Sequence, residues 1–396
     1  MTPSAHRLRL VVPRYGAEVS GGSELLVRRL ARALCDRSWD VEVWTTTAID
    51  EATWSAGFPV GETDDGGVKV RRFPVSRRRP PRLFHQMSRA LFRLPPVLRP
   101  EAAWLAVQGP YAPDLVRALA RDTDRASLFM PYLYHPTIRG MPVAAHPRLL
   151  IPAAHDEPAL RLRLVGRTVA AADALWYSSE EERALMESAH PIAARRPHAV
   201  GTVAIDPPAG IDGEGFRSRH SLGRYLLYAG RFTPGKGIDV LLDGYARLRR
   251  NMPDVSLALA GDISALGDCP EGTVRLGWLE ETELWSAISA AEAVVVPSRL
   301  ESLSLVSLEA WAMGRPCLLH AGSPVLAGQA ARSGGAELFR DAAELAGAAG
   351  RLLADPAAAG RMGEAGRSHV ALHYRWSAVV DRLEGLLAAA SKEAMR

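Results

Sequence analysis

The sequence predicts a doubly wound α/β protein built from two domains. Apolar runs alternate with amphipathic stretches from one end of the chain to the other, which is typical of βαβ units. The chain has 396 residues, and a domain usually takes about 100–200. A segment rich in Pro, Gly and Asp, Gly201–Gly223, separates two series of alternating elements. We therefore expect a Rossmann-like domain over residues 1–200, a second over 201–376, and a C-terminal helix over 377–396 that crosses back to the first domain.

The individual elements are predicted from apolar runs and from capping residues. A helix is expected at Ser23–Arg37, and another at Ser179–Ser188, where Ser179 and Glu182 form a capping box. The last amphipathic helix is expected at Ser377–Ala390. The predicted strands of the first domain are Leu8–Val12, Val41–Thr45, Val68–Arg72, Trp104–Gln108, Ser127–Pro131, Leu149–Ala153 and Ala174–Tyr177. Those of the second domain are Tyr225–Ala229, Val255–Ala260, Thr273–Leu276, Ala293–Val296 and Pro316–His320.

The composition is that of a soluble protein and excludes several classes. No window of 18 consecutive apolar residues is present, so no membrane-spanning helix is expected. The first residues lead directly into a strand without a long apolar segment, so no signal peptide is expected. Three isolated cysteines favour a reducing cytoplasm and argue against disulfides or a zinc site. The net charge of +4 does not indicate nucleic-acid binding.

The segment Pro297–Pro316 carries the strongest functional signal, because it places two carboxylates at a favoured position. Glu301 follows the apolar run Ala293–Val296, so it is expected where a buried parallel strand ends and a helix begins. Glu309 lies eight residues on, within a largely apolar helix expected from about Ser302 to Met313. Helix-borne glutamates are usually solvated or paired. A carboxylate on so apolar a helix needs a partner or a ligand, and sugar hydroxyls are suitable ligands.

A second signal is the sequence GRFTPGKG, Gly230–Gly237, directly after the strand at Tyr225–Ala229. It is one residue short of a P-loop, and Gly237 stands where that motif needs Ser or Thr for magnesium. Arg231 and Lys236 beside a helix start are suited to a diphosphate. The alternative is a surface turn with solvated charges. Lys236 is one of only three lysines, and this rarity favours the functional reading.

Weaker signals lie in the first domain. Gly21 and Gly22 precede a helix after the first strand, and paired glycines allow close backbone approach to a phosphate or sugar, although glycine before a helix is common. His155 follows the strand expected at Leu149–Ala153; it is either a structural histidine or part of a site at that strand end. The His155–Glu157 cluster lacks the spacing of a zinc site.

The region Gly66–Pro100 contains no acidic residue and many arginines, with Phe84, Met87, Leu91 and Phe92 interleaved. Peripheral contact with an anionic membrane at its inner face, or binding of an acidic acceptor, is one interpretation. An exposed basic loop and helix is the other.

Together these motifs resemble those of the retaining GT-B glycosyltransferases of family 4, also called glycosyl transferases group 1. The resemblance covers most of the chain and is strongest over Tyr225–Pro316, with weaker matches at Gly21–Glu24, Gln108–Tyr111 and His155–Asp156. It implies two Rossmann-like domains that face each other across a cleft. One departure is Ser302–Leu305, where the family often has a glycine-containing loop. Asp122–Thr123–Asp124 matches the metal motif of the other main glycosyltransferase architecture, but it precedes a strand and is expected to be a solvated turn.

The resemblance also implies roles for the candidate residues. A nucleotide-diphosphate sugar, for instance a UDP-sugar, would be held mainly by the second domain. Arg231 and Lys236 would neutralise the diphosphate, Glu301 would hold the transferred sugar, and Glu309 would bind the ribose. Backbone N–H groups near Ser304 and Leu305 would meet the sugar or distal phosphate, while Gly21 and Gly22 would approach from the first domain and His155 would help to place the sugar.

The reaction implied is hexosyl transfer to a hydroxyl acceptor with retention of the anomeric configuration. Fixed cations and helix N-termini stabilise the departing diphosphate without a metal, and no cofactor is expected. The acceptor class stays open between a natural product, a small metabolite, and a lipid or cell-envelope glycan. The alternatives are a sugar-nucleotide epimerase or hydrolase on the same fold, a P-loop nucleotidase, and a protein that binds a sugar nucleotide without turnover. The sequence does not indicate an oligomeric state.

Overall fold

The computed structural model describes residues 7–19, 21–233, 235–262 and 266–394, and it divides into two units. The first unit consists of residues 1–203 together with 376–396, and the second consists of residues 204–375. Each is an α/β domain built around a largely parallel sheet, as the alternation of apolar and amphipathic segments predicts. Among the described helices, none has both the length and the apolar character needed to cross a bilayer.

The first unit contains an eight-stranded sheet in its described part, in the order β3-β4-β2-β1-β5-β6-β7-β8. All neighbours are parallel except β3 and β4. Burial on both faces explains why the central strands read as continuous apolar runs. The strands are β1 Arg7–Val11, β2 Asp40–Thr46, β3 Gly61–Asp65, β4 Val68–Phe73, β5 Ala126–Phe129, β6 Arg148–Leu150, β7 Ala174–Tyr177 and β8 His198–Val200.

The helices of the first unit cover this sheet, and the C-terminal helix α15 (Trp376–Ala394) packs against β6, β7 and β8. Two short helices, α4 (Pro113–Arg121) and α5 (His135–Gly140), pack against each other. The remaining helices are α1 Gly22–Cys35, α2 Pro81–Arg93, α3 Glu101–Gln108, α6 Arg163–Ala171 and α7 Glu180–Ala189. The 3-10 turns are η2 Pro96–Leu98, η3 Met141–Val143, η4 Pro158–Arg161 and η5 Pro191–Arg195.

One predicted strand of the first unit is wrong. Trp104–Gln108 is the second half of helix α3, not a strand. Its apolar residues Trp104 and Leu105 are buried against α2 and the first core, so a short apolar run here marks a buried helix face. Periodicity does not separate these two cases in so short a segment.

The second unit contains a six-stranded, all-parallel sheet in its described part, in the order β11-β10-β9-β12-β13-β14. Its faces are both covered: Leu226 and Val295 pack with α9 and α13, whereas the Tyr225 hydroxyl donates to the Ala287 carbonyl of α10. The strands are β9 Arg224–Ala229, β10 Val255–Ala260, β11 Thr273–Gly277, β12 Ala293–Val296, β13 Cys317–His320 and β14 Ala336–Phe339.

The helices of the second unit include one inside the segment expected to be a linker. Residues 213–219 form α8, capped by Asp212, whose side chain accepts from the Gly215 N–H, and α8 packs against α10. The linker prediction is therefore wrong for this part of the segment. The other helices are α9 Ile238–Arg249, α10 Glu281–Ala290, α11 Leu305–Ala312, α12 Pro324–Ser333, α13 Ala342–Ala354 and α14 Pro356–His373.

Candidate active site

The strand order of the second unit's sheet reverses between β9 and β12. Successive strands run outward from β9 to β10 and β11 on one side, and from β12 to β13 and β14 on the other. Loops that leave neighbouring strands toward opposite sides open a crevice at the carboxyl edge of the sheet, and open α/β folds bind ligands there. The loop Gly230–Gly237 follows β9 and the loop Pro297–Ser304 follows β12, so both sequence motifs lie at this switch point.

Lys236 and Glu301 form an ion pair across the switch point. The Lys236 Nζ atom donates to Glu301 Oε1 at 2.7 Å, and the two side chains are 25% and 13% exposed. They are 65 residues apart in sequence, so only the pairing of β9 with β12 brings them together. The pair is accessible and carries both a cation for phosphates and a carboxylate for hydroxyls.

Gly237 explains how the two loops come into contact. Its backbone has φ +70°, and a Cβ added here would lie 2.2 Å from the carbonyl oxygen of Pro297. A side chain would therefore push the β9 loop away from the end of β12. Gly237 is also the residue before α9, where a P-loop would need Ser or Thr, and this packing leaves no room for either side chain.

Arg231 is exposed at the start of the same loop, and its carbonyl accepts a hydrogen bond from the Tyr228 hydroxyl at 2.8 Å. Burial raises the pKa of Tyr228 well above its usual value; Glu301 adds to this effect and Arg231 opposes it. The charges of Arg231 and Glu301 thus both act on one buried phenol. The two cations predicted for the diphosphate, Arg231 and Lys236, belong to one short loop beside Glu301.

Helix α11 carries the remaining candidate residues of the second unit. Ser304 caps its first turn by accepting from the Ser307 N–H, and Ser304 is only 3% exposed. Leu305 is the first helical residue, so its N–H lies at the positive end of the helix dipole. Glu309 is 4% exposed on a helix whose neighbouring residues Leu308 and Trp311 are fully buried. Glu309 is therefore a buried carboxylate held on a helix, about one turn after the helix begins.

Gly21 and Gly22 stand at the start of α1 in the first unit, after β1. The strand order of this sheet reverses between β1 and β5, so the two glycines also follow a strand at a switch point. Gly21 has φ +154°, and a Cβ on it would lie 2.1 Å from the carboxylate of Glu24. Glu24 in turn pairs with Arg14 at 2.6 Å. Gly21 therefore has a structural reason to be glycine, whereas Gly22 is exposed; contact of either with a donor stays a prediction.

His155 follows β6 and is half-buried in a tight turn. Its carbonyl accepts from the Glu157 N–H at 2.8 Å, and the preceding residue, Ala154, donates its N–H to Glu182 at 2.7 Å. Glu182 is fully enclosed, and burial raises its pKa to about 7, although the N–H groups of Ala154 and Ser178 favour the charged form. Glu182 was expected to act only in the capping box of α7; it also fixes the turn that carries His155.

The candidate residues thus form two groups, one in each unit, and the members of each group lie near the ends of strands. Arg231, Lys236 and Glu301, with the start of α11, lie at one switch point of the second unit. Gly21, Gly22 and His155 lie at strand ends of the first unit. That all of them act on one donor stays a prediction.

The Asp122–Thr123–Asp124 turn is engaged in ion pairs rather than simply solvated. It connects α4 to the amino end of β5. Asp122 pairs with Arg9 at 2.7 Å, and Asp124 pairs with Arg7 at 2.6 Å. Arg9 is fully buried in β1, where its guanidinium lies 3.9 Å above the ring of Trp44, so the turn neutralises a buried cation.

Trp278 is a further candidate residue that the sequence patterns did not predict. It follows β11 at the same carboxyl edge as Lys236 and Glu301 and is 66% exposed, in contrast to the buried Trp285 and Trp311 of this unit. The signal available was a tryptophan directly after a predicted strand, Thr273–Leu276. A large exposed ring at a ligand-binding edge is suited to stacking on a flat ligand.

The family models for "Glycosyl transferases group 1" and "Glycosyl transferase 4-like domain" match residues 223–355 and 21–202. A similar protein is the alpha-D-kanosaminyltransferase of Streptomyces kanamyceticus, with 30% identity covering 67% of this chain and 75% of that protein. This chain belongs to the group 1 glycosyltransferases, with the GT-B fold that the motifs predicted.

Other relatives differ in how much of their length is matched. A glycogen synthase of Mycobacterium tuberculosis is 35% identical over 39% of this chain and only 40% of its own length. A D-inositol 3-phosphate glycosyltransferase of Stackebrandtia nassauensis is 28% identical over 96% of this chain and 89% of its own.

Two solved structures share the fold at low identity. Sucrose-phosphate synthase from Thermosynechococcus elongatus superposes with a TM-score of 0.72 at 19% identity, covering 98% of this chain and 99% of that one. HepE from Anabaena in complex with UDP and glucose superposes with a TM-score of 0.70 at 15% identity, covering 97% and 100%.

Proposed function

We propose that this protein transfers a hexose from a nucleotide-diphosphate sugar to a hydroxyl acceptor, with retention of the anomeric configuration and without a metal. The observation that carries the proposal is the Lys236–Glu301 pair at the switch point of the second unit, with Arg231 in the same loop. The donor proposed is a UDP-sugar, because the structurally similar HepE was solved with UDP and glucose. The acceptor class stays open between a natural product, a small metabolite, and a lipid or cell-envelope glycan.

Each residue has a role that follows from its chemistry. Arg231 and Lys236 neutralise the diphosphate, and the N–H groups at the start of α11, around Ser304 and Leu305, donate to the distal phosphate or the sugar. Glu301 accepts from sugar hydroxyls, and the buried Glu309 accepts from the ribose hydroxyls. In the first unit, Gly21 and Gly22 leave room for the donor, and His155 hydrogen-bonds the sugar.

The proposed step breaks the bond between the anomeric carbon and the phosphate oxygen and forms a bond from the same carbon to the acceptor oxygen on the same face. The acceptor proton passes to the departing phosphate oxygen, so the products are the glycoside and the nucleoside diphosphate. Negative charge develops on the diphosphate as the bond breaks. Fixed cations placed there stabilise the transition state more than the ground state. Lys236 is held in place by Glu301 before the donor arrives, which reduces reorganisation during the step.

The test is a thermal-shift screen against UDP-, GDP-, ADP- and dTDP-sugars, followed by a transfer assay with the sugar that binds. A ligand that binds the native state raises the midpoint of unfolding. The proposal requires that at least one nucleotide sugar raise it and that the corresponding free sugar not do so. A protein that is stabilised by none of these donors would refute the donor assignment.

An epimerase or hydrolase on the same fold is the alternative, since either would bind the same donor. Incubation of the donor without any acceptor separates the three activities. An isomerised nucleotide sugar identifies an epimerase, and rapid release of free sugar identifies a hydrolase. A transferase leaves most of the donor intact until an acceptor hydroxyl is supplied.

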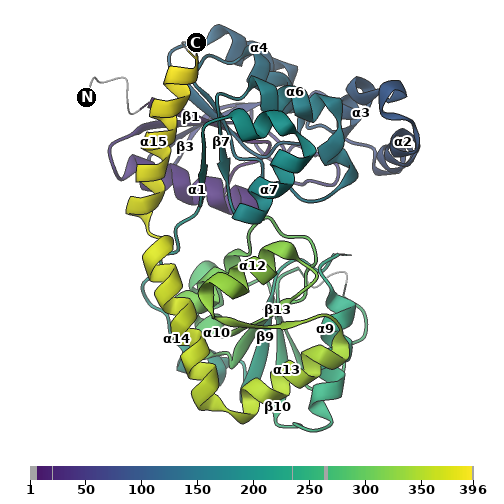
Figure 1. Cartoon of the computed structure of the whole chain (residues 1–396), viewed down its shortest axis with the longest axis vertical. Helices are drawn as coiled ribbons and strands as arrows, with labels where there is room; N and C mark the ends of the chain where they lie inside the picture. The colour runs from purple at the N-terminus through teal and green to yellow at the C-terminus, as the bar shows by residue number, and fades with distance from the viewer. Residues whose placement is uncertain (1–6, 20, 234, 263–265, 395–396) are drawn as a thin grey trace. The chain divides into compact units, whose positions relative to one another are not determined.

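We also infer a cytoplasmic location with peripheral contact to an anionic membrane through the region 66–100. Figure 1 shows α2 and α3 together at the margin of the first unit. The four apolar residues expected at this surface, Phe84, Met87, Leu91 and Phe92, instead pack into or against the core of the first unit, and other apolar residues face outward. Phe84 and Phe92 face inward and pack near Trp104, with ring centroids 6.0 and 5.9 Å from it. The outward apolar residues are Leu83, Leu94, Val97 and Leu98, which are 44%, 38%, 74% and 65% exposed.

The charges around these four residues favour an anionic lipid surface as the partner. Arg82, Arg89 and Arg93 of α2 are exposed, and no acidic residue occurs between Gly66 and Pro100. Exposed apolar side chains flanked by arginines fit the headgroup layer, where the apolar groups insert and the guanidinium groups meet lipid phosphates. This surface would hold the enzyme beside a membrane-bound acceptor.

A further inference from the structure

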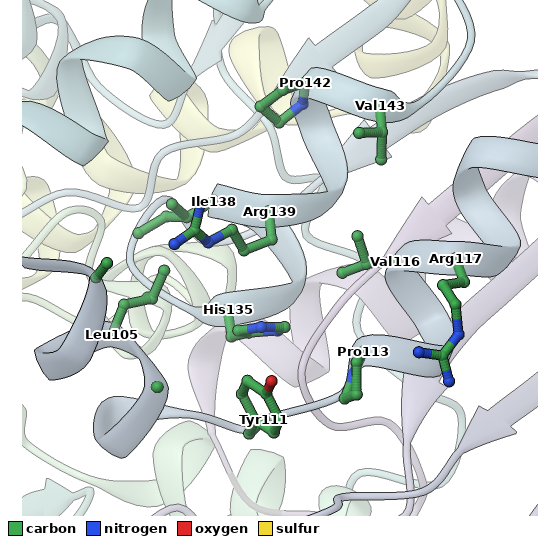
Figure 2. Close-up of a pocket in the computed structure, with 12 residues that line it drawn as sticks. Leu105, Tyr111, Pro113, Val116, Arg117, His135, Ile138, Arg139, Pro142 and Val143 are labelled. Atoms are coloured by element: carbon green, nitrogen blue, oxygen red, sulfur yellow. The ribbon is translucent and has the colours of Figure 1, made fainter.

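A hollow of about 620 Å³ lies within the first unit, between α3, α4, α5 and η3. Figure 2 shows Tyr111 and His135 at one end of it and Pro142 and Val143 at the other. Its volume is in the range of small-molecule sites, which typically hold about 300–1,000 Å³. None of the candidate donor residues lines it, so it is available for another ligand.

The end with Tyr111 and His135 belongs to the carboxyl edge of the sheet. Helix α5 begins at His135, six positions after the last residue of β5, and the His135 N–H donates to the Gly109 carbonyl at 3.1 Å. Tyr111 lies in the loop that this hydrogen bond fixes. Its ring packs edge-on against the His135 ring, with the two ring centroids 4.7 Å apart. Doubly wound domains bind their ligands at the carboxyl edge of the sheet.

His135 is a polar group that the fold leaves incompletely satisfied. It is 6% exposed, and its Nδ1 atom has no hydrogen-bond partner among the described residues. Burial, together with the positive charges of Arg139 and Arg77, lowers its pKa to about 4, so the ring is neutral at pH 7. A neutral imidazole offers one donor and one acceptor, which suits a hydroxyl group. A buried polar atom without a partner is unfavourable, so a ligand that hydrogen-bonds to this ring gains affinity.

The other residues that line the hollow are apolar side chains and two arginines, so its surface is both apolar and polar. Its walls include Leu105, Val116, Ile138 and Val143, and none of the residues that line it is acidic. Two arginines, Arg117 and Arg139, complete the lining. Arg117 bonds to Asp114 one turn earlier, whereas Arg139 is exposed and has no ion-pair partner among the described residues. The hollow therefore matches an apolar body with a negatively charged group, better than a neutral polar sugar.

We propose that this hollow is the acceptor site, and that the acceptor is an apolar molecule carrying a hydroxyl and one negatively charged group. The hydroxyl lies at the Tyr111–His135 end, the apolar body fills the space between α3, α4 and α5, and Arg139 pairs with the anion. The inference rests on the proposed transfer to a hydroxyl acceptor and specifies the class of that acceptor.

Three probes separate the features of this ligand in calorimetric titrations of the full chain. The first is 3-hydroxydodecanoate, whose hydroxyl and carboxylate lie close together, as His135 and Arg139 do on α5, and whose alkyl chain is the apolar body. Its methyl ester lacks the charge, and 4-hydroxybutanoate lacks the apolar body. We expect the long hydroxy acid to bind at least ten-fold more tightly than either of the others. Equal affinity for the acid and its ester would overturn the proposal.

Variants then assign the binding to this hollow. Arg139→Gln, on an exposed side chain, should reduce the affinity for the acid to that for the ester and leave the ester unchanged. Val116→Trp should obstruct the hollow and abolish binding of both. Arg361→Gln, an exposed arginine of α14 in the second unit, is the matched control and should change nothing. Binding that survives both Arg139→Gln and Val116→Trp refutes this site.

A separate measurement of donor binding distinguishes failure of the acceptor proposal from failure of the proposed function. The midpoint shift produced by the nucleotide sugar is measured in the same variants. It should be unchanged in Arg139→Gln and Val116→Trp, which also shows that they fold. If no nucleotide sugar binds the wild type, the donor assignment fails, whatever the hollow binds. If the donor binds and the long hydroxy acid does not, only the acceptor proposal fails.

Discussion

The Lys236 Nζ and Glu301 Oε1 atoms lie 2.7 Å apart where the order of the described strands of the second unit reverses. The sequence predicts both residues as donor ligands but gives no reason for them to touch. Their contact means that the cation meant for the diphosphate is already oriented by the carboxylate meant for the sugar. Removal of either side chain should therefore also disturb the other.

Lys236→Ala should lower kcat/KM for the donor by about 100-fold or more, because a preorganised cation at the leaving group is lost. Glu301→Ala should have an effect of similar size, and the double variant should lose less than the product of the two, since the residues act as a unit. Lys392→Ala, near the C-terminus of α15, is the control. The measurement is the initial rate of transfer. Rates near wild type in either single variant would contradict the assignment.

Trp278→Ala should raise the donor Kd by about ten-fold, because stacking of a base on an aromatic ring contributes roughly 1–3 kcal/mol. Trp278→Phe should retain much of the affinity. The ring is 66% exposed, so the midpoint of thermal unfolding without ligand should change little in either variant. Donor titrations monitored by calorimetry check this expectation. An unchanged Kd in Trp278→Ala would show that the base lies elsewhere.

Gly237→Ala should destabilise the protein by about 2 kcal/mol, because a positive φ is unfavourable for any residue with a side chain. A new Cβ would also meet the Pro297 carbonyl and separate Lys236 from Glu301, so transfer should fall as well. Gly223→Ala is the matched control, since a Cβ there meets no atom within 4 Å. Urea unfolding and transfer rates are compared for the two variants. Equal stability of both would exclude this packing role.

Glu182 should make the stability of the first unit decrease as the pH rises. Burial raises the pKa of its carboxyl from 4.5 to about 7, so the folded state binds more protons than the unfolded state between these values. Its contribution is thus full below about pH 4.5 and is lost toward pH 7, by about 3 kcal/mol in all. Glu182→Gln should flatten this part of the profile. Urea unfolding from pH 5 to 8 tests it, and parallel profiles for both proteins would contradict it.

The proposed membrane surface predicts binding to vesicles of phosphatidylcholine that contain phosphatidylglycerol, and little binding to pure phosphatidylcholine. Arg82→Gln, Arg89→Gln and Arg93→Gln together should weaken binding about 100-fold, at about 1 kcal/mol for each charge. Val97→Ser with Leu98→Ser should weaken it independently of salt. Co-sedimentation provides the measurement.

A matched control for the vesicle experiment replaces exposed arginines of the second unit, Arg247→Gln, Arg340→Gln and Arg361→Gln. These changes remove the same net charge and should leave binding nearly intact. If both triple variants lose binding equally, the attraction is a general effect of charge and the surface on α2 is not the docking site.

Most of the fold could be predicted because parallel strands are buried on both faces. The strands β7, β10 and β12 have the ranges expected from their apolar runs. The strand β3, GETDD, was not predicted, because it is a polar, exposed edge strand defined only by its antiparallel pairing with β4. The helix α3 was predicted as a strand, because five apolar-rich residues carry no period that separates the two.

The sequence by itself determined the chemistry of the candidate site: Arg231, Lys236, Glu301 and Glu309 follow predicted strands or lie on an apolar helix, and local pattern suffices to place such residues at strand ends. Only the tertiary structure decided which of them meet, because the pairing of β9 with β12 joins residues 65 positions apart. It also decided that Gly21 makes room for Glu24 and that Glu182 fixes the turn before His155. These relationships depend on distances between loops, which no local pattern encodes.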